Sequence, residues 1–323
     1  MINREEKRRE PGASTAARTV DSAYRQILGR PTDAAGAAHY IAELTAGRLS
    51  EWTMRQDLAD SAEARARETR RVADSAAYLA SGGVSTRGVE GAEEFQWSYA
   101  NTAEWASRFP DCDGKEQSPI EIYGATASPQ VALRLDHTAA LVTAVINNGH
   151  ALQINIPPVP PQFAEFNGKR YSLKQLHFHA PSEHTRHGVQ ADAEAHLVHV
   201  ADDGSLLVVG VLLRAVPRST SRARALAALL VQNAPPAEGE NEITLVVDPR
   251  DILPVTPNLF HYTGSLTTPP CTESVKWFVM EAMAEVDPAL IANLIALFGQ
   301  TARPTQAIGD RVIFYGSLTP PPK

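Results

Sequence analysis

The 323-residue sequence is poor in cysteine and has no long apolar run. Two cysteines, Cys112 and Cys271, are too few for a disulfide-rich scaffold, so the fold depends on an ordinary hydrophobic core. No run approaches the roughly 20 apolar residues that cross a bilayer, so we expect no transmembrane segment. Residues 1–11 are charged and no apolar stretch follows them, so no secretory signal is visible.

The sequence also lacks an excess of positive charge. It has 30 Lys and Arg against 37 Asp and Glu, a formal net charge of -7. Nucleic-acid binding needs a basic face, so we expect no nucleic-acid partner. Hydrophobic residues make up 43% and charged residues 21%, as in ordinary globular proteins. The length suggests about two domains, taking roughly 150 residues per domain as a prior.

Apolar residues at helical spacing mark residues 15–80 as a small all-α domain. The first helix contains Val20 and Leu28. Asp33, which follows a proline break, is expected to cap a second helix that ends near Thr45. This domain shows no catalytic constellation.

Residues 81–92 are rich in Ser and Gly and predict a linker, and residues 93–318 have a different character. Short β-branched runs alternate there with Gly, Pro and Asn, which predicts a strand-rich domain. Examples of such runs are 141–147, 151–156, 172–179, 193–200, 206–213, 242–247 and 274–280, and helices are expected at 221–232 and 288–298. The predicted fold class is therefore mainly β, preceded by a small all-α domain.

Two strand-like segments carry histidines. His177 and His179 lie two residues apart, so their imidazoles point to the same face of a strand, and His196 supplies a third nitrogen if its strand is a neighbour. Three imidazoles leave one position of a tetrahedral zinc site open for water, which is typical of catalytic zinc. Gln175 and Glu194 each lie two residues from a histidine on the same face, so we expect them to accept hydrogen bonds from the outer ring N–H groups.

Five segments, in order, resemble the alpha carbonic anhydrases. They are Gln117–Ile120, Asn147–His150, Gln175–His184, Glu194–His199 and Gly264–Glu273, and the resemblance spans about residues 95–317. It implies a large twisted, mostly antiparallel sheet with short peripheral helices and a zinc ion, Zn²⁺, at the base of a conical cleft. The implied activity is the reversible hydration of carbon dioxide to bicarbonate and a proton, with zinc hydroxide as the nucleophile.

The same resemblance implies residue roles. His177, His179 and His196 match the zinc ligands. Thr267 matches the hydroxyl that accepts a hydrogen bond from zinc-bound hydroxide, and Glu183 matches the carboxylate that accepts from Thr267.

The resemblance also implies roles for the walls of the cleft. His150 matches the proton shuttle, an imidazole of pKa about 6.5 near the cleft mouth. The residues matching the apolar wall for carbon dioxide are Val198, Val208, Leu266 and Trp277. Thr267 and Thr268 are further substrate-binding residues, and Thr268, Tyr99 and Asn148 match the polar wall.

The other histidines are given structural roles. We expect His184 to support the Glu194 region, and His199 to face away from the metal, in the core or at the surface. His137, His187 and His261 are interpreted as solvated loop residues. Trp97 is interpreted as packing at the N-terminal edge of the domain.

Cysteine count alone favours two unrelated thiols. The resemblance instead places Cys112 and Cys271 where extracytoplasmic members of the family have a disulfide. The pair therefore suggests a periplasmic or extracellular protein. Because no signal peptide is visible, a cytoplasmic location stays open.

Two alternatives accompany this interpretation. The second function considered is a non-catalytic binding module on the same fold, in which a ligand histidine is typically replaced. Residues 24–36 resemble a small helical domain of bacterial secreted and surface proteins, distantly similar to phycobilisome linker domains. That resemblance predicts an attachment role with a protein partner, and an inert spacer is its alternative.

Overall fold

The structure, a computed structural model, describes residues 15–28, 30–49, 53–54, 57–58, 61–62 and 97–319. The chain divides into two compact units, residues 1–68 and 69–323. The predicted linker, residues 81–92, lies outside the described residues. Within the described ranges, no helix has both the length and the apolar character needed to cross a membrane.

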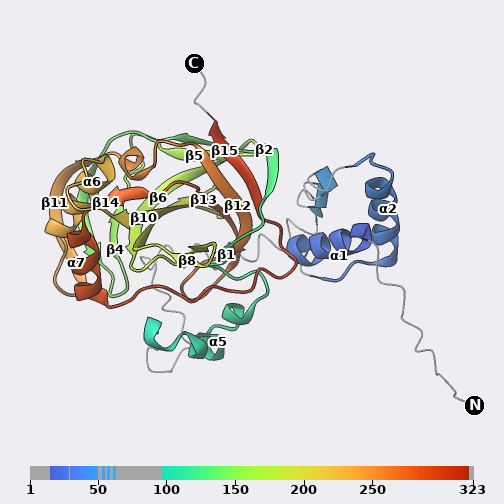
Figure 1. The fold of residues 1–323 in the computed structure, drawn as a ribbon, viewed down its shortest axis with the longest axis horizontal. Helices are drawn as coiled ribbons and strands as arrows, with labels where there is room; N and C mark the ends of the chain where they lie inside the picture. Colours follow the sequence, from blue (N-terminus) through green and yellow to red (C-terminus); the bar gives the residue numbers. More distant parts are fainter. Residues whose placement is uncertain are drawn as a thin grey trace, which may run out of the picture. The chain divides into compact units, whose positions relative to one another are not determined.

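The first unit includes the helices α1 (Thr15–Leu28) and α2 (Ala34–Thr45), coloured blue in Figure 1. Asp33 caps α2 as predicted, because its side chain accepts a hydrogen bond from the Gly36 N–H. This unit has its own apolar cluster, made of Val20, Ala23, Tyr24, Met54 and Leu58.

The second unit is built from strands, with short helices around them (Figure 1). Its strands are β1 (Glu121–Ile122), β2 (Thr126–Asp136), β3 (Ala140–Asn147), β4 (Leu152–Asn155), β5 (Phe163–Phe166), β6 (Lys169–His179), β7 (Thr185–Arg186), β8 (Val189–Gln190), β9 (Ala193–Val200), β10 (Leu206–Ala215), β11 (Gly239–Val247), β12 (Asn258–Ser265), β13 (Glu273–Met280), β14 (Ala284–Val286) and β15 (Phe314–Thr319). Its helical segments are η1 (Tyr99–Glu104), α5 (Trp105–Arg108), η2 (Pro110–Asp113), α6 (Arg222–Gln232), η3 (Pro249–Ile252) and α7 (Pro288–Phe298).

Most of these strands form a single 12-stranded sheet. Its order is β11-β3-β4-β6-β5-β2-β15-β12-β13-β10-β14, and β9 pairs with both β10 and β6. The pairs β10–β13, β10–β14 and β15–β2 are parallel, and the other pairs of this sheet are antiparallel. The prediction of a large, mostly antiparallel sheet is confirmed.

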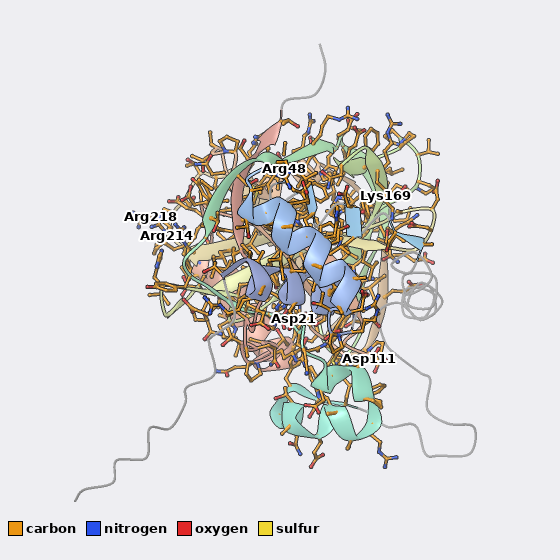
Figure 2. All side chains as sticks on the ribbon, turned by 90° about the vertical axis from the view of Figure 1, so that its right-hand side faces the viewer. Asp21, Arg48, Asp111, Lys169, Arg214 and Arg218 are labelled. Atoms are coloured by element: carbon orange, nitrogen blue, oxygen red, sulfur yellow. A yellow bond between two sulfur atoms is a disulfide. The ribbon has the colours of Figure 1, made fainter. Side chains whose placement is uncertain are left out.

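The helices α6 and α7 begin where the sequence predicts. Ser221 accepts a hydrogen bond from the Arg224 N–H, and Asp287 accepts one from the Ala289 N–H, so each helix has a side-chain cap. Arg214, near the end of β10, lies at the outside of the unit (Figure 2). Its ion pair with Glu285 is largely solvated and so contributes little to stability.

The prediction that His137 and His261 are solvated was wrong, whereas His187 is exposed as expected. His261 lies inside β12, where its ring stacks on Phe278 and its Nδ1–H donates to the Trp277 carbonyl. Burial lowers the pKa of His261 to about 3 and that of His137 to about 4. Both rings are therefore neutral near pH 7 and pack as aromatic groups.

Candidate functional site

The three candidate ligands meet because β6 and β9 are antiparallel neighbours. His177 on β6 lies directly opposite His196 on β9, and His179 lies opposite Glu194. The two-residue period of a strand puts His177 and His179 on the same face as His196. The structure therefore brings together the two segments that the sequence left separate.

The ring nitrogens converge on one point. His177 Nε2 lies 2.9 Å from His179 Nε2 and 3.3 Å from His196 Nδ1. A tetrahedral zinc ion with Zn–N bonds of about 2.0–2.1 Å would hold its nitrogen ligands about 3.3 Å apart. The donor set and its spacing therefore fit zinc.

Each outer ring nitrogen faces an oxygen atom. His177 Nδ1 lies 2.7 Å from Gln175 Oε1, and His196 Nε2 lies 3.0 Å from Glu194 Oε1. His179 Nδ1 lies 2.7 Å from the Thr301 carbonyl oxygen. If these outer nitrogens donate, the three inner nitrogens carry the lone pairs that a metal ion needs.

Glu194 is itself fixed on every side. Its Oε2 accepts from the backbone N–H of His184 at 2.8 Å, and its Oε1 lies 2.7 Å from His184 Nδ1, as the predicted supporting role of His184 requires. Gly210 makes room for it, because a Cβ there would lie 2.8 Å from Glu194 Oε1. Burial acts to raise the pKa of Glu194, but His184 and His196 hold it well below its usual value.

The three histidines are held in the neutral form. Burial, and then the neighbouring imidazoles, lower the pKa of His177 well below its ordinary value. Burial also lowers the pKa of His179 to about 4 and lowers that of His196. Neutral imidazole is the form that binds metal, so no proton has to be displaced near pH 7.

Glu183 lies directly beneath this cluster and is buried. Its Oε1 accepts from the Arg303 backbone N–H at 3.0 Å, and its Oε2 lies 3.5 Å from His179 Nε2. Burial raises the pKa of Glu183 to about 7, opposed by His196 and by the Thr267 hydroxyl. Thr267 therefore lies next to this carboxylate, as the sequence comparison implies.

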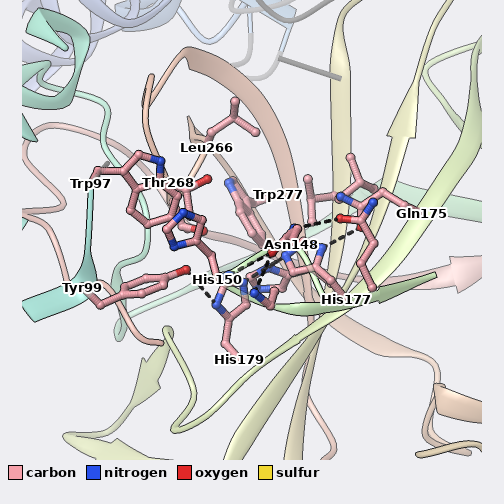
Figure 3. A pocket seen from close by; sticks show the side chains of 16 residues that line it. Trp97, Tyr99, Asn148, His150, Gln175, His177, His179, Leu266, Thr268 and Trp277 are labelled. Atoms are coloured by element: carbon pink, nitrogen blue, oxygen red, sulfur yellow. Dashed lines mark hydrogen bonds between the residues drawn. The ribbon is translucent and has the colours of Figure 1, made fainter. Parts of the chain in front are cut away.

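A single cleft contains the candidate ligands and all predicted wall residues (Figure 3). Val198 lies opposite Val208 across β9 and β10, and Val208 lies opposite Trp277 across β10 and β13. These residues and Leu266 also belong to a buried hydrophobic core cluster. The apolar wall is thus continuous with the core, which keeps it rigid. The predicted polar residues Thr267, Thr268, Tyr99 and Asn148 line the same cleft.

His150 is held near the cleft mouth by a turn. Gly149 has φ +80°, and Asn148 Oδ1 accepts from the N–H groups of His150 and Ala151. The His150 ring stacks on Trp97 with centroids 3.6 Å apart (Figure 3). Burial lowers the pKa of His150 to about 4, so in this position the ring is a weak proton acceptor at neutral pH.

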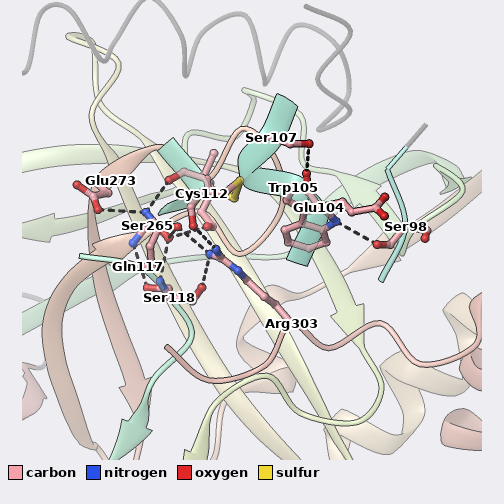
Figure 4. Close-up of a disulfide and its surroundings, with 12 residues drawn as sticks. Ser98, Glu104, Trp105, Ser107, Cys112, Gln117, Ser118, Ser265, Glu273 and Arg303 are labelled. Carbon is pink, nitrogen blue, oxygen red and sulfur yellow. Dashed lines mark hydrogen bonds between the residues drawn. A yellow bond between two sulfur atoms is a disulfide. The ribbon is translucent and has the colours of Figure 1, made fainter. Parts of the chain in front are cut away.

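Cys112 and Cys271 form a disulfide between residues 159 apart in sequence. Cys271 closes a turn by donating its N–H to the Thr268 carbonyl. The bond therefore joins the turn that follows Thr267 and Thr268 to η2, which contains Cys112 (Figure 4). The disulfide prediction is confirmed.

Several contributors were not foreseen. Trp97 is buried as expected, but it lines the cleft against His150 instead of serving only as edge packing. Thr301 and Arg303 contact His179 and Glu183 through backbone atoms, which leave no side-chain signal in a sequence. Gly210 leaves room for Glu194 Oε1, and this role depends on a neighbouring strand that the sequence around Gly210 does not reveal.

Comparison with known proteins agrees with this geometry. The eukaryotic-type carbonic anhydrase profile matches residues 100–317. A carbonic anhydrase of Nostoc sp. is 32% identical over 69% of this chain and 86% of its own length, and one of Neisseria gonorrhoeae is 33% identical over 62% and 77%. The structure of the Photobacterium profundum alpha-carbonic anhydrase, 38% identical, superposes with a TM-score of 0.62 over 68% of this chain and 100% of that one.

Proposed function

Because the chain belongs to the alpha-class carbonic anhydrase family, whose members catalyse the reversible hydration of carbon dioxide, we propose that His177, His179 and His196 hold the zinc ion for this reaction. The observation that carries the proposal is the convergence of three neutral ring nitrogens whose outer nitrogens all face oxygen atoms. In carbonic anhydrases, bound zinc lowers the pKa of water to about 7 and so supplies the nucleophile at neutral pH.

Thr267 and Glu183 are proposed to orient that nucleophile. In this role the Glu183 carboxylate accepts a hydrogen bond from the neighbouring Thr267 hydroxyl, which directs the lone pairs of the hydroxyl oxygen into the cleft. The Arg303 N–H on Glu183 Oε1 fixes the carboxylate in turn. This arrangement selects one orientation before carbon dioxide arrives, which lowers the entropic part of the barrier.

Val198, Val208, Leu266 and Trp277 are proposed to hold carbon dioxide. A nonpolar gas offers no strong hydrogen bonds, so an apolar wall beside the histidines binds it by excluding water. The wall residues are at most 5% exposed, which keeps their positions fixed. Bicarbonate is charged, so the same wall favours its release.

His150 is proposed to carry the product proton to buffer. It lies at the cleft with the polar residues Tyr99 and Asn148, where ordered water can connect it to the reacting centre. To accept a proton near pH 7 the ring has to leave the Trp97 face, since burial there lowers its pKa to about 4.

Stopped-flow hydration of carbon dioxide, combined with metal analysis, tests the proposal. The purified protein should contain one zinc per chain, lose activity on chelation and regain it on adding zinc. Zinc-loaded protein without hydration activity would contradict it. That same result is expected for the second candidate, a binding module, although none of the three histidines is replaced here.

We also propose that residues 15–80 form a helical domain with an attachment or assembly role, as their resemblance to linker-type domains suggests. The apolar cluster formed by Val20, Ala23 and Tyr24 of α1 with Met54 and Leu58 supports a unit with a core of its own. Deleting residues 1–92 should leave hydration unchanged and abolish binding to a partner or oligomerisation. Unchanged localisation, oligomerisation and partner binding would contradict the role.

A periplasmic or extracellular location is proposed from the disulfide, since such bonds persist in oxidising compartments. Alkylating free thiols during cell lysis, followed by mass spectrometry, tests it. Two alkylated cysteines would contradict the location.

A further inference from the structure

The segment after α7 touches the candidate site twice. The Thr301 carbonyl faces His179 Nδ1 at 2.7 Å, and the Arg303 N–H donates to Glu183 at 3.0 Å. Thr301 is tied to the end of β6, because its N–H donates to the Ala180 carbonyl and its hydroxyl oxygen accepts from the Ala180 N–H. A short irregular segment thus orients one candidate ligand and the carboxylate beneath it.

The other end of this segment is held by the Arg303 side chain (Figure 4). Its Nη1 donates to Gln117 Oε1 and to the Ser118 carbonyl, both at 2.8 Å, and its Nη2 donates to the Cys112 carbonyl at 3.0 Å. The guanidinium carbon lies 5.5 Å from the centre of the Trp105 ring. The residue is 4% exposed, so these contacts are made away from bulk water.

Gln117 carries the connection to the opposite side of the cleft. Its Nε2 donates to the Cys271 carbonyl at 3.2 Å and to Glu273 Oε1 at 3.1 Å. Cys271 closes the turn that begins at Thr268. Arg303 is therefore the point at which the segment supporting Glu183 and the turn next to Thr267 are joined.

Burying the charged side chain of Arg303 costs desolvation free energy, which its contacts have to offset. Burial lowers the pKa of Arg303 to about 10, so the group still carries its charge near pH 7. Its three acceptors are neutral carbonyl oxygens, which offset less of the desolvation cost than a carboxylate would. A planar fork of donors, however, can fix several acceptors at once, which lysine cannot do.

We propose that Arg303 is a positioning residue for hydration: its guanidinium fixes the 301–303 segment, which in turn orients His179 and Glu183. The inference rests on the proposed zinc site. It predicts an effect on turnover and on zinc retention, because both supported groups belong to that site. It predicts little effect on the affinity for carbon dioxide, because three of the four apolar wall residues, Val198, Val208 and Trp277, lie on β9, β10 and β13, which the Arg303 side chain does not contact.

The test compares Arg303→Met and Arg303→Lys with Arg311→Lys in the full chain. Arg311 is a matched control: it is 7% exposed, and it donates to the carbonyls of Ile308, Thr263 and Ala307. For Arg303→Met we expect kcat to fall tenfold to a hundredfold and zinc to bind tenfold to a hundredfold more weakly, as outer partners of metal ligands typically show. KM should stay within about twofold, Arg303→Lys should be intermediate, and Arg311→Lys should retain both values.

A third readout needs no metal. In the metal-free protein, hydrogen exchange at the Arg303 and Ala180 amides should be faster in Arg303→Lys than in Arg311→Lys. Should Arg303→Met fail to fold, Gln117→Met removes one acceptor and should shift kcat and zinc affinity in the same direction by less. Wild-type protein without zinc or activity would defeat the proposed function itself. Active wild type together with Arg303 variants of unchanged kcat and zinc affinity would overturn only this inference.

Discussion

His196 and His199 lie on opposite faces of the same strand, β9, and each meets another imidazole. On one face, His196 joins His177 and His179, and every outer nitrogen faces an oxygen atom. On the other face, His199 Nε2 lies 3.0 Å from His137 Nε2, and His199 Nδ1 lies 3.3 Å from the Leu207 carbonyl.

The difference lies in where the ring protons are. If His199 donates from Nδ1, its Nε2 is an acceptor, and His137 Nε2–H fills the space between the two rings. One N–H then forms a hydrogen bond between His137 and His199, and no space remains for a metal ion. On the opposite face of β9, three nitrogen lone pairs point at one position. Among the described residues, His137 Nδ1 has no hydrogen-bond partner, which an unprotonated nitrogen tolerates better than an N–H would. The oxygen atoms that accept from the outer ring nitrogens, more than the number of imidazoles, distinguish the candidate metal site from the packed histidine pair.

The largest expected effect comes from removing one histidine on each face. His177→Ala should lose zinc and lower hydration activity more than a hundredfold, exceeding the effect of losing an outer partner. His137→Gln should retain one zinc per chain and activity within about twofold. Metal analysis and stopped-flow assays measure both. Equal losses of zinc and activity in the two variants would show that the two faces of β9 do not differ in this way.

The packed histidine pair should instead appear in the pH dependence of stability. In the unfolded chain His137 is protonated below its ordinary pKa of about 6.5, whereas in the folded protein burial lowers this pKa to about 4. The free energy of unfolding therefore falls as the pH drops from about 6.5 to about 4. From pH 7 to pH 5 the contribution is about 2 kcal/mol. In urea unfolding, the free energy of unfolding of His137→Gln should fall less between pH 7 and pH 5 than that of the wild type, by about that amount. Parallel pH profiles in the two proteins would refute it.

A smaller effect should come from an outer acceptor on the site face. Gln175→Leu removes the partner of His177 Nδ1 and should raise the zinc dissociation constant about tenfold. Gln162→Leu is the matched control, since Gln162 is equally buried but accepts from the Thr138 N–H. Competition with a chromophoric chelator measures both constants. The idea fails if the two variants bind zinc alike.

The smallest effect concerns His150, whose stacking partner is an indole. Trp97→Ala should expose the ring and raise its pKa from about 4 toward 6.5, because burial is what lowers it. NMR titration of the imidazole measures the change, with exposed His187 as the internal reference. Hydration in weak buffer should rise a fewfold. An unmoved His150 pKa would show that Trp97 does not control it.

The spacing of the histidines predicted that three imidazoles converge, and side-chain patterns predicted helices α6 and α7. The family resemblance predicted the residues that line the cleft and the Cys112–Cys271 disulfide. The sequence did not identify Thr301 or Arg303, whose contributions to His179 and Glu183 are backbone atoms 122 and 120 residues away. It also misjudged His137 and His261, since the partner that lets an imidazole be buried lies on another strand. The strands β1, β2, β5, β7, β8, β12, β14 and β15 lie outside the β-branched runs that were named from the sequence.

The Thr301 carbonyl has a consequence for how the protein is made. His177, His179 and His196 leave the ribosome long before residue 301, which follows α7. For much of translation the imidazoles therefore exist without the carbonyl that aims His179. With the proposed zinc site, tight metal capture becomes possible only after residue 301 has been synthesised, so a chain truncated before this segment is expected to present the three histidines and bind zinc weakly.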